Sequence, residues 1–192
     1  MKNPLNKRLP REFRKDFGKY LVIFLLLVIT IGFVSGFLVA DGSMIKAYNE
    51  GIDKYNTENG HFRTSEKMND AQIQSVEENG IRIYDNFYLE QNLTNGSTMR
   101  IFANREQVNL ACLMEGVFPK AANEIAIDRM YADNNKISIG DTLKSDTQSW
   151  KVTGFIALPD YSCLFQNNND SMFDSVKFGI GVVTSEAFES LD

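Results

Sequence analysis

The stretch LVIFLLLVITIGFVSGFLVA at residues 21–40 decides the architecture of this chain. It holds no charged residue, and as a helix it would cover about 30 Å, the thickness of the hydrocarbon core of a bilayer. A helix is expected because backbone groups in lipid must bond to each other. We therefore predict a transmembrane helix over 20–41. A cleaved signal peptide is the alternative, but the apolar run is long for one and no small-residue cleavage site follows it.

The segment before this run, residues 1–19, is basic. Because Lys and Arg stay on the cytoplasmic side, we expect residues 1–19 to be cytoplasmic, and residues 42–192 to be extracytoplasmic on a cell (plasma) membrane. Leu9, Phe13 and Phe17 recur every four residues, and Pro10 suits a helix start. This predicts an amphipathic helix on the inner leaflet, with its cations near anionic lipid. A flank without fixed structure is the alternative. The basic residues are Lys2, Lys7, Arg8, Arg11, Arg14, Lys15 and Lys19.

Small residues in the apolar run offer a packing face. Gly32, Ser35 and Gly36 lie on one side of the expected helix, and the Gly32–Gly36 spacing allows another helix to approach closely. The alternative is that these glycines have no packing role, since glycine is common in such helices.

The outer part of the chain is acidic. The basic flank carries seven Lys or Arg against Glu12 and Asp16, the apolar run is uncharged and the whole chain has a net charge of −5, so residues 41–192 carry −10. Such a domain repels phosphate backbones, which argues against nucleic acid as a partner.

Short β-branched and aromatic runs alternate with helical patterns, without a regular βαβ repeat, and this favours an α+β fold. We expect the membrane helix to continue through 42–57. Asn69 and Gln72 form a capping box for a helix over 70–79 that buries Ile73 and Val76 and ends at Gly80. Further helices are expected over 128–134 and, capped by Thr184, up to Leu191. Strands are expected at 81–84, 87–90, 98–102, 109–113, 124–127, 150–158 and 178–183.

Residues with chemical potential are few. The single histidine, His61, has no acidic partner at a recognised metal spacing and is expected to be structural or on the surface, at a strand start. Cys112 and Cys163 are expected to be free and buried, although an outer compartment would also permit a disulfide.

Two Asn/Asp-rich runs, 133–135 and 167–170, are expected to be surface turns rather than calcium loops, since neither has the central Gly and terminal Glu. Glycosylation sequons begin at Asn92, Asn95 and Asn169 and matter only on a eukaryotic secretory route. We expect no catalytic, metal-binding or cofactor-binding residues and no enzymatic activity.

Residues 115–143, EGVFPKAANEIAIDRMYADNNKISIGDTL, carry an ordered set of motifs. They are a turn with Gly116 and Pro119, an Asn-Glu-Ile strand over 123–127, a short helix with Ala132, and a Gly-Asp-Thr turn over 137–142. Within that last motif, Gly140-Asp141 is expected to make a hairpin turn. The strand and exit WKVTGFIALPDY at 150–161 follows. Together with the basic segment and first span, this set resembles FtsX-like, MacB-type ABC transporter permeases, with a MacB-like periplasmic core domain outside the membrane.

The resemblance implies a function in efflux or mechanical coupling across the membrane, driven by ATP hydrolysis in a separate cytoplasmic ABC ATPase subunit. It also implies as partners the remaining permease transmembrane helices or a second permease copy, and the lipid bilayer. Such permeases have at least four spans, and residues 1–192 contain one, so we expect this chain to be the N-terminal part of a longer permease or a truncated product. The alternative function is a single-pass membrane-anchored sensor or adhesion domain.

Overall fold

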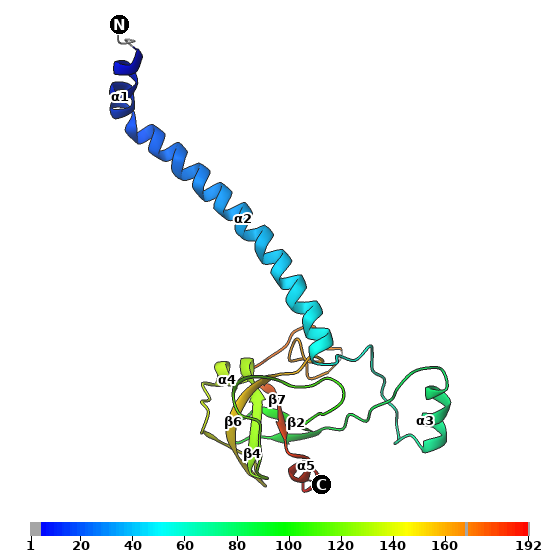
Figure 1. Cartoon of the computed structure of the whole chain (residues 1–192). Coiled ribbons are helices and arrows are strands. Elements are labelled where there is room, and N and C mark those ends of the chain that lie inside the picture. The colour runs from blue at the N-terminus through cyan, green and yellow to red at the C-terminus, as the bar shows by residue number, and fades with distance from the viewer. Residues whose placement is uncertain (1–4, 168, 192) are drawn as a thin grey trace. The chain divides into compact units, whose positions relative to one another are not determined.

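The computed structural model describes residues 5–167 and 169–191 (Figure 1). The chain divides into two compact units, residues 1–50 and 51–192. Lys2, from the basic flank, and Asn168, from the second polar turn, lie outside the described residues, as do the side chains of Lys7 and Leu9.

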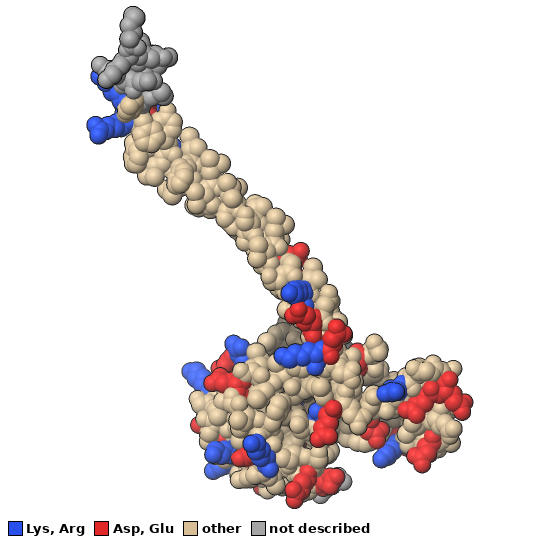
Figure 2. Space-filling model, in the orientation of Figure 1, with Lys and Arg blue, Asp and Glu red and all other residues tan. Residues whose placement is uncertain are grey.

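The first unit is helical. Helix α1 (Leu5–Lys15) is followed by helix α2 (Phe17–Lys54), which has 38 residues and no buried side chain. In a helix the backbone N–H and C=O groups bond to each other, as a membrane span requires. The exposed apolar side chains of α2 are of the kind that a lipid surrounding would accept. Figure 2 shows no Lys, Arg, Asp or Glu on the visible face of the apolar part of α2. The expected span 20–41 therefore lies within a helix long and apolar enough to cross a membrane.

Pro10 does not start a helix, contrary to the expectation. Helix α1 begins at Leu5, so Pro10 lies in its second turn. Proline has no N–H to give to the carbonyl one turn back, and one bond of α1 is therefore missing. The expected continuation of the span through 42–57 is confirmed as far as Lys54, where α2 ends.

A curled, mixed seven-stranded sheet forms the body of the second unit. Strand order is β1-β2-β7-β4-β6-β3, with β5 pairing beside β3 on β6. The pairs β2·β7 and β4·β6 are parallel and the other four are antiparallel. A bridge between Leu93 and Ser145 brings the end of β1 to the end of β5, so the sheet curls into a half-barrel. The strands are β1 (Leu89–Asn92), β2 (Thr98–Ala103), β3 (Cys112–Gly116), β4 (Glu124–Asp128), β5 (Thr142–Lys144), β6 (Ser149–Ala157) and β7 (Phe178–Val183).

The core fills the curl of the sheet. Trp150 and Tyr131 are its largest fully buried side chains. Helix α4 (Arg129–Asn135) lays the Tyr131 ring directly on Gly179 of β7, where a Cβ atom would stand 2.5 Å from the ring. The missing side chain therefore makes room for the aromatic ring.

The predicted short helices form within about two residues of their expected bounds. Helix α3 (Asp70–Glu77) has the expected capping box between Asn69 and Gln72. Asp128 caps α4 and Thr184 caps helix α5 (Ser185–Glu189), each accepting a bond from a backbone N–H three residues later. One expectation about α3 is wrong: Ile73 and Val76 are only half-buried, because α3 makes no extensive contact with any strand of the sheet.

The strands are predicted less well than the helices. No strand forms over 81–84, β1 and β3 begin two and three residues later than expected, and β5 was not expected. Gly140 has the left-handed φ of 100° that its turn needs, but this turn leads into β5 and is not a hairpin. The β5–β6 hairpin closes instead where Ser145 N–H donates to the Gln148 carbonyl, at 2.8 Å. Strand pairing depends on distant partners, and a short run does not reveal them.

Candidate functional site

In residues 5–167 and 169–191, no three His, Cys, Asp or Glu side chains converge as metal ligands would. His61 is exposed, in line with a surface role, and its Nδ1 lies 2.8 Å from Glu58 Oε1. It stands in an irregular segment and not at the strand start that we expected.

Both cysteines are free thiols. Cys163 is exposed, which corrects the expectation that it is buried. Cys112 is half-buried at the start of β3, and Tyr55 Oη donates a hydrogen bond to its Sγ at 2.8 Å. This thiol is therefore part of the contact between the segment that leaves α2 and the sheet.

That contact is the first notable site, the α2 junction, which we define as Tyr55 and Asn56 with the loop 105–112. The last turn of α2, from Gly51 to Lys54, belongs to the same compact unit as the sheet. The loop donates two backbone bonds to the residues that leave this turn: Leu110 N–H to the Tyr55 carbonyl at 2.8 Å, and Asn109 N–H to the Asn56 carbonyl at 3.0 Å. The end of α2 is thus bonded to the sheet domain through main-chain groups.

Asn109 strengthens the junction. It is 1% exposed and has a left-handed φ of 50°, a conformation that Asn tolerates better than most residues. Its side chain accepts from the Glu58 N–H at 2.9 Å and donates to Glu58 Oε2 at 2.5 Å. A buried amide with both polar ends satisfied fixes the loop in one arrangement.

A buried ion pair continues this network. Arg105 Nη1 lies 2.6 Å from Asp160 Oδ1, and the two side chains are 10% and 9% exposed. The same nitrogen donates to the Asn109 carbonyl at 3.4 Å. Nε and Nη2 of Arg105 are buried without a hydrogen-bond partner among the described residues. The pair ties the loop 105–112 to the turn that follows β6.

A second arginine, Arg100, holds the segment that follows β6 at Tyr161 and Gln166. Arg100 on β2 donates to Glu90 Oε1 at 2.5 Å, to Tyr161 Oη at 2.8 Å and to the Gln166 carbonyl at 2.8 Å. The Tyr88 ring lies 4.2 Å from its guanidinium carbon. Burial acts to lower the pKa of Arg100, but the bonds to Tyr161 and Glu90 outweigh it, and the net shift is upward. Burial raises the pKa of Tyr161, so both groups keep their protons and the bond between them persists.

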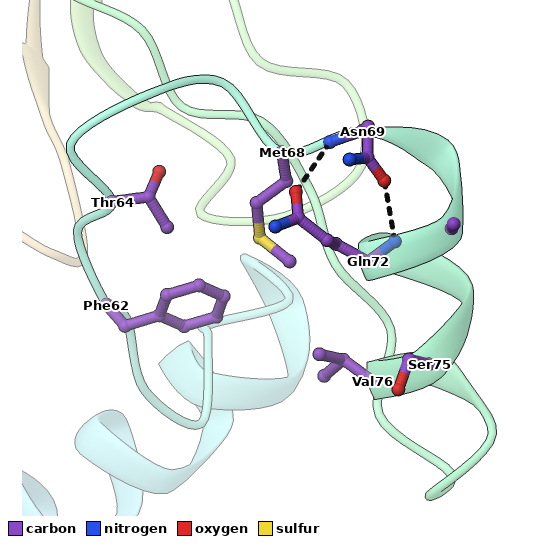
Figure 3. A pocket seen from close by; sticks show the side chains of 8 residues that line it. Phe62, Thr64, Met68, Asn69, Gln72, Ser75 and Val76 are labelled. Carbon is purple, nitrogen blue, oxygen red and sulfur yellow. Dashed lines mark hydrogen bonds between the residues drawn. The ribbon is translucent and has the colours of Figure 1, made fainter.

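An open hollow lies beside α3. It has a volume of about 540 Å³. Figure 3 shows the side chains of Phe62, Met68 and Val76 around it, with the Asn69–Gln72 capping box at one end. Thr64, Gln72 and Ser75 add polar groups, and no charged side chain lines it. This arrangement can accept an apolar group, and the hydroxyl groups of Thr64 and Ser75 have no His, Lys or carboxylate beside them among the lining residues.

The sequence reasoning missed the α2 junction and both buried arginines. Their partners lie far apart in the chain, as Arg105 and Asp160 do, and no short motif joins them. One signal was available: Arg100 lies within the buried run of β2 and Arg105 follows that strand closely, and a charge in such surroundings needs a partner.

Comparison with known proteins returned no match: no family model, no curated protein and no solved structure is similar to this chain at a significant level.

Proposed function

We propose that this chain is the N-terminal part of an FtsX-like, MacB-type ABC transporter permease. In this proposal α2 is the first span and the half-barrel is an extracytoplasmic domain of the MacB-like periplasmic core type. A cytoplasmic ABC ATPase supplies the energy, and the remaining helices come from the rest of the permease or from a second copy. The protein then acts in efflux or in mechanical coupling across the membrane.

One observation carries the proposal. Helix α2 does not end with its apolar run at residue 40 but continues without a break to Lys54, and the next two residues are bonded to the sheet domain. A continuous helix resists bending far better than a loop, so it can pass a displacement from the membrane to the domain. A simple tether needs no such continuity.

Breaking the helix tests this function. In the full-length permease with its ATPase, Ala47→Pro removes a helix bond between the apolar run and the junction, at a local cost of about 3 kcal/mol. We expect transport, or the transport-linked phenotype, to be lost while the ATPase still co-purifies. Ala47→Ser is the matched control and should keep transport. Full transport by Ala47→Pro would contradict the proposal.

The gene itself offers a cheaper test. We expect the natural reading frame to continue beyond codon 192 into further hydrophobic segments, with an ATPase gene nearby. A native stop codon after Asp192, without an ATPase partner, would instead favour the second candidate, a single-pass sensor or adhesion protein. The open hollow beside α3 favours that candidate, because an uncovered apolar surface is typical of binding sites.

A further inference from the structure

The other end of α2 carries a second uncovered surface, formed by α1 and the first turns of α2. We define this N-terminal surface by its aromatic residues Phe13, Phe17 and Tyr20 and its cations Arg11, Arg14 and Lys15. All lie in the first compact unit. The helix is interrupted at Asp16, and Figure 1 shows the chain changing direction there.

The aromatic residues gather across this interruption. The Phe13 ring lies 5.7 Å from the Phe17 ring and is stacked 5.4 Å from the Tyr20 ring. Clustering would normally hide such rings from water, yet Phe13 and Phe17 are each 51% exposed and Tyr20 is 48% exposed. Aromatic side chains at the end of an apolar run are typical of the boundary between lipid and water.

The N-terminal surface has more Lys and Arg side chains than Asp and Glu side chains. Glu12 is paired with Arg8 at 2.7 Å, and Asp16 is paired with Lys19 at 3.0 Å. Among the described residues, no carboxylate pairs with Arg11, Arg14 or Lys15. The surface therefore presents positive charge without internal compensation.

Charge and apolar surface lie on different sides of α1. Arg11, Arg14 and Lys15 are three and four residues apart, which puts them on one face of a helix. Phe13 is two residues from both Arg11 and Lys15, so it lies about 200° around the helix from each. A helix lying in the membrane interface has this arrangement, with rings toward the acyl chains and cations toward the headgroups.

We propose that the N-terminal surface binds anionic phospholipid headgroups of the bilayer that α2 crosses, and that α1 lies on the membrane only when such lipids are present. The inference rests on α2 being a membrane span, which the proposed function shares. A soluble phosphate is the less suitable ligand, because the cations line no pocket and a small anion would leave the rings in water.

The test uses the full chain in lipid nanodiscs, made either of phosphatidylcholine alone or with about 30% phosphatidylglycerol, a fraction that gives a marked negative surface potential. Phe13→Trp reports the position of α1, after subtraction of the signal of Trp150 in the parent chain. With phosphatidylglycerol present, we expect its emission to shift to the blue and to be quenched by lipids brominated near the headgroup. In phosphatidylcholine alone both effects should be weak, and inorganic phosphate should not restore them.

Charge variants make the test specific. Each cation near an anionic surface changes binding by about fivefold, so replacing Arg11, Arg14 and Lys15 together by Gln should weaken it on the order of a hundredfold. This variant should give a lipid-independent spectrum. The matched control replaces three exposed lysines of the sheet domain, Lys120, Lys144 and Lys177, by Gln and should behave like the parent.

Trypsin offers a second measurement on the unmodified chain. Cleavage after Arg11 and Arg14 should slow in discs that contain phosphatidylglycerol and recover in high salt. Equal spectra and equal cleavage in the two lipids would overturn the inference, and so would a triple variant that still responds to phosphatidylglycerol. Recovery of the chain in discs, checked by size exclusion, separates this failure from a failure of α2 to insert.

Discussion

The half-barrel and the segment around α3 belong to one compact unit but are held by different forces. We call residues 61–87 the α3 lobe. The half-barrel buries Trp150, Tyr131 and a continuous set of apolar side chains, whereas no residue of the α3 lobe is buried. The α3 lobe keeps its form through local polar contacts: the capping box of α3 and the 3.9 Å ion pair between Lys67 and Asp85. Packing therefore stabilises the half-barrel cooperatively, whereas the α3 lobe is expected to unfold locally while the half-barrel stays folded.

The largest expected difference between the two regions concerns their ion pairs. Asp160→Asn leaves the Arg105 charge buried without its counterion, and we expect the free energy of unfolding to fall by about 3 kcal/mol or more. Asp85→Asn in the α3 lobe should change it by less than about 0.5 kcal/mol, since that pair is exposed. Urea unfolding of the full chain in detergent, followed by the fluorescence of the buried Trp150, measures both. Equal losses of unfolding free energy in the two variants would contradict the difference between the two regions.

The next effect tests close packing. Gly179→Ala forces a methyl group against the Tyr131 ring, and we expect a loss of about 1–3 kcal/mol by the same urea assay. Gly60, just before the α3 lobe, has no atom within 4 Å of a Cβ, so Gly60→Ala is the control and should be nearly neutral. A neutral Gly179→Ala would mean that α4 does not press its ring onto β7.

Capping variants separate local from global stability. Asn69→Ala removes the cap of α3, worth about 1 kcal/mol, and should speed hydrogen exchange in 70–77 while leaving global unfolding unchanged. Thr184→Ala removes a comparable bond from α5, where Ala187 is buried against the body. This second variant should lower the midpoint of global unfolding. A global effect of Asn69→Ala would show that the α3 lobe unfolds together with the sheet.

The smallest expected effect depends on pH. Burial raises the pKa of Asp128, the N-cap of α4, so its charged form is disfavoured in the folded state. Protonated Asp128 contributes its full share to the free energy of unfolding below the ordinary Asp pKa of about 4. This contribution is lost as the pH rises through the higher pKa of the folded state. Asp128→Asn keeps a capping oxygen but no longer titrates.

Parallel urea titrations of the two chains at pH 4 and pH 7 measure this linkage. Relative to Asp128→Asn, the parent chain should gain stability, by less than about 1 kcal/mol, as the pH falls from 7 to 4. Asp146→Asn, at an exposed carboxylate that does not contribute to the pKa shift of Asp128, serves as the control for the loss of one charge. A relative gain of the parent chain at higher pH would contradict the sign.

The amino-acid sequence by itself determined the features that depend on near neighbours. The apolar run at 21–40, the capping box at Asn69 and Gln72, and the cap at Thr184 are each complete within a few residues. Hydropathy and capping act over one or two helical turns, so the helices could be predicted close to their observed positions.

Only the tertiary structure decided which strands pair and what the buried charges contact. Strand β5, the Arg105–Asp160 pair and the junction between Tyr55 and Cys112 all join residues whose partners the local pattern does not reveal. The same is true of α3, whose apolar residues resemble a core-facing stripe but do not pack extensively on the sheet. Burial and pairing are properties of the assembled fold, because a side chain is buried only when distant segments cover it.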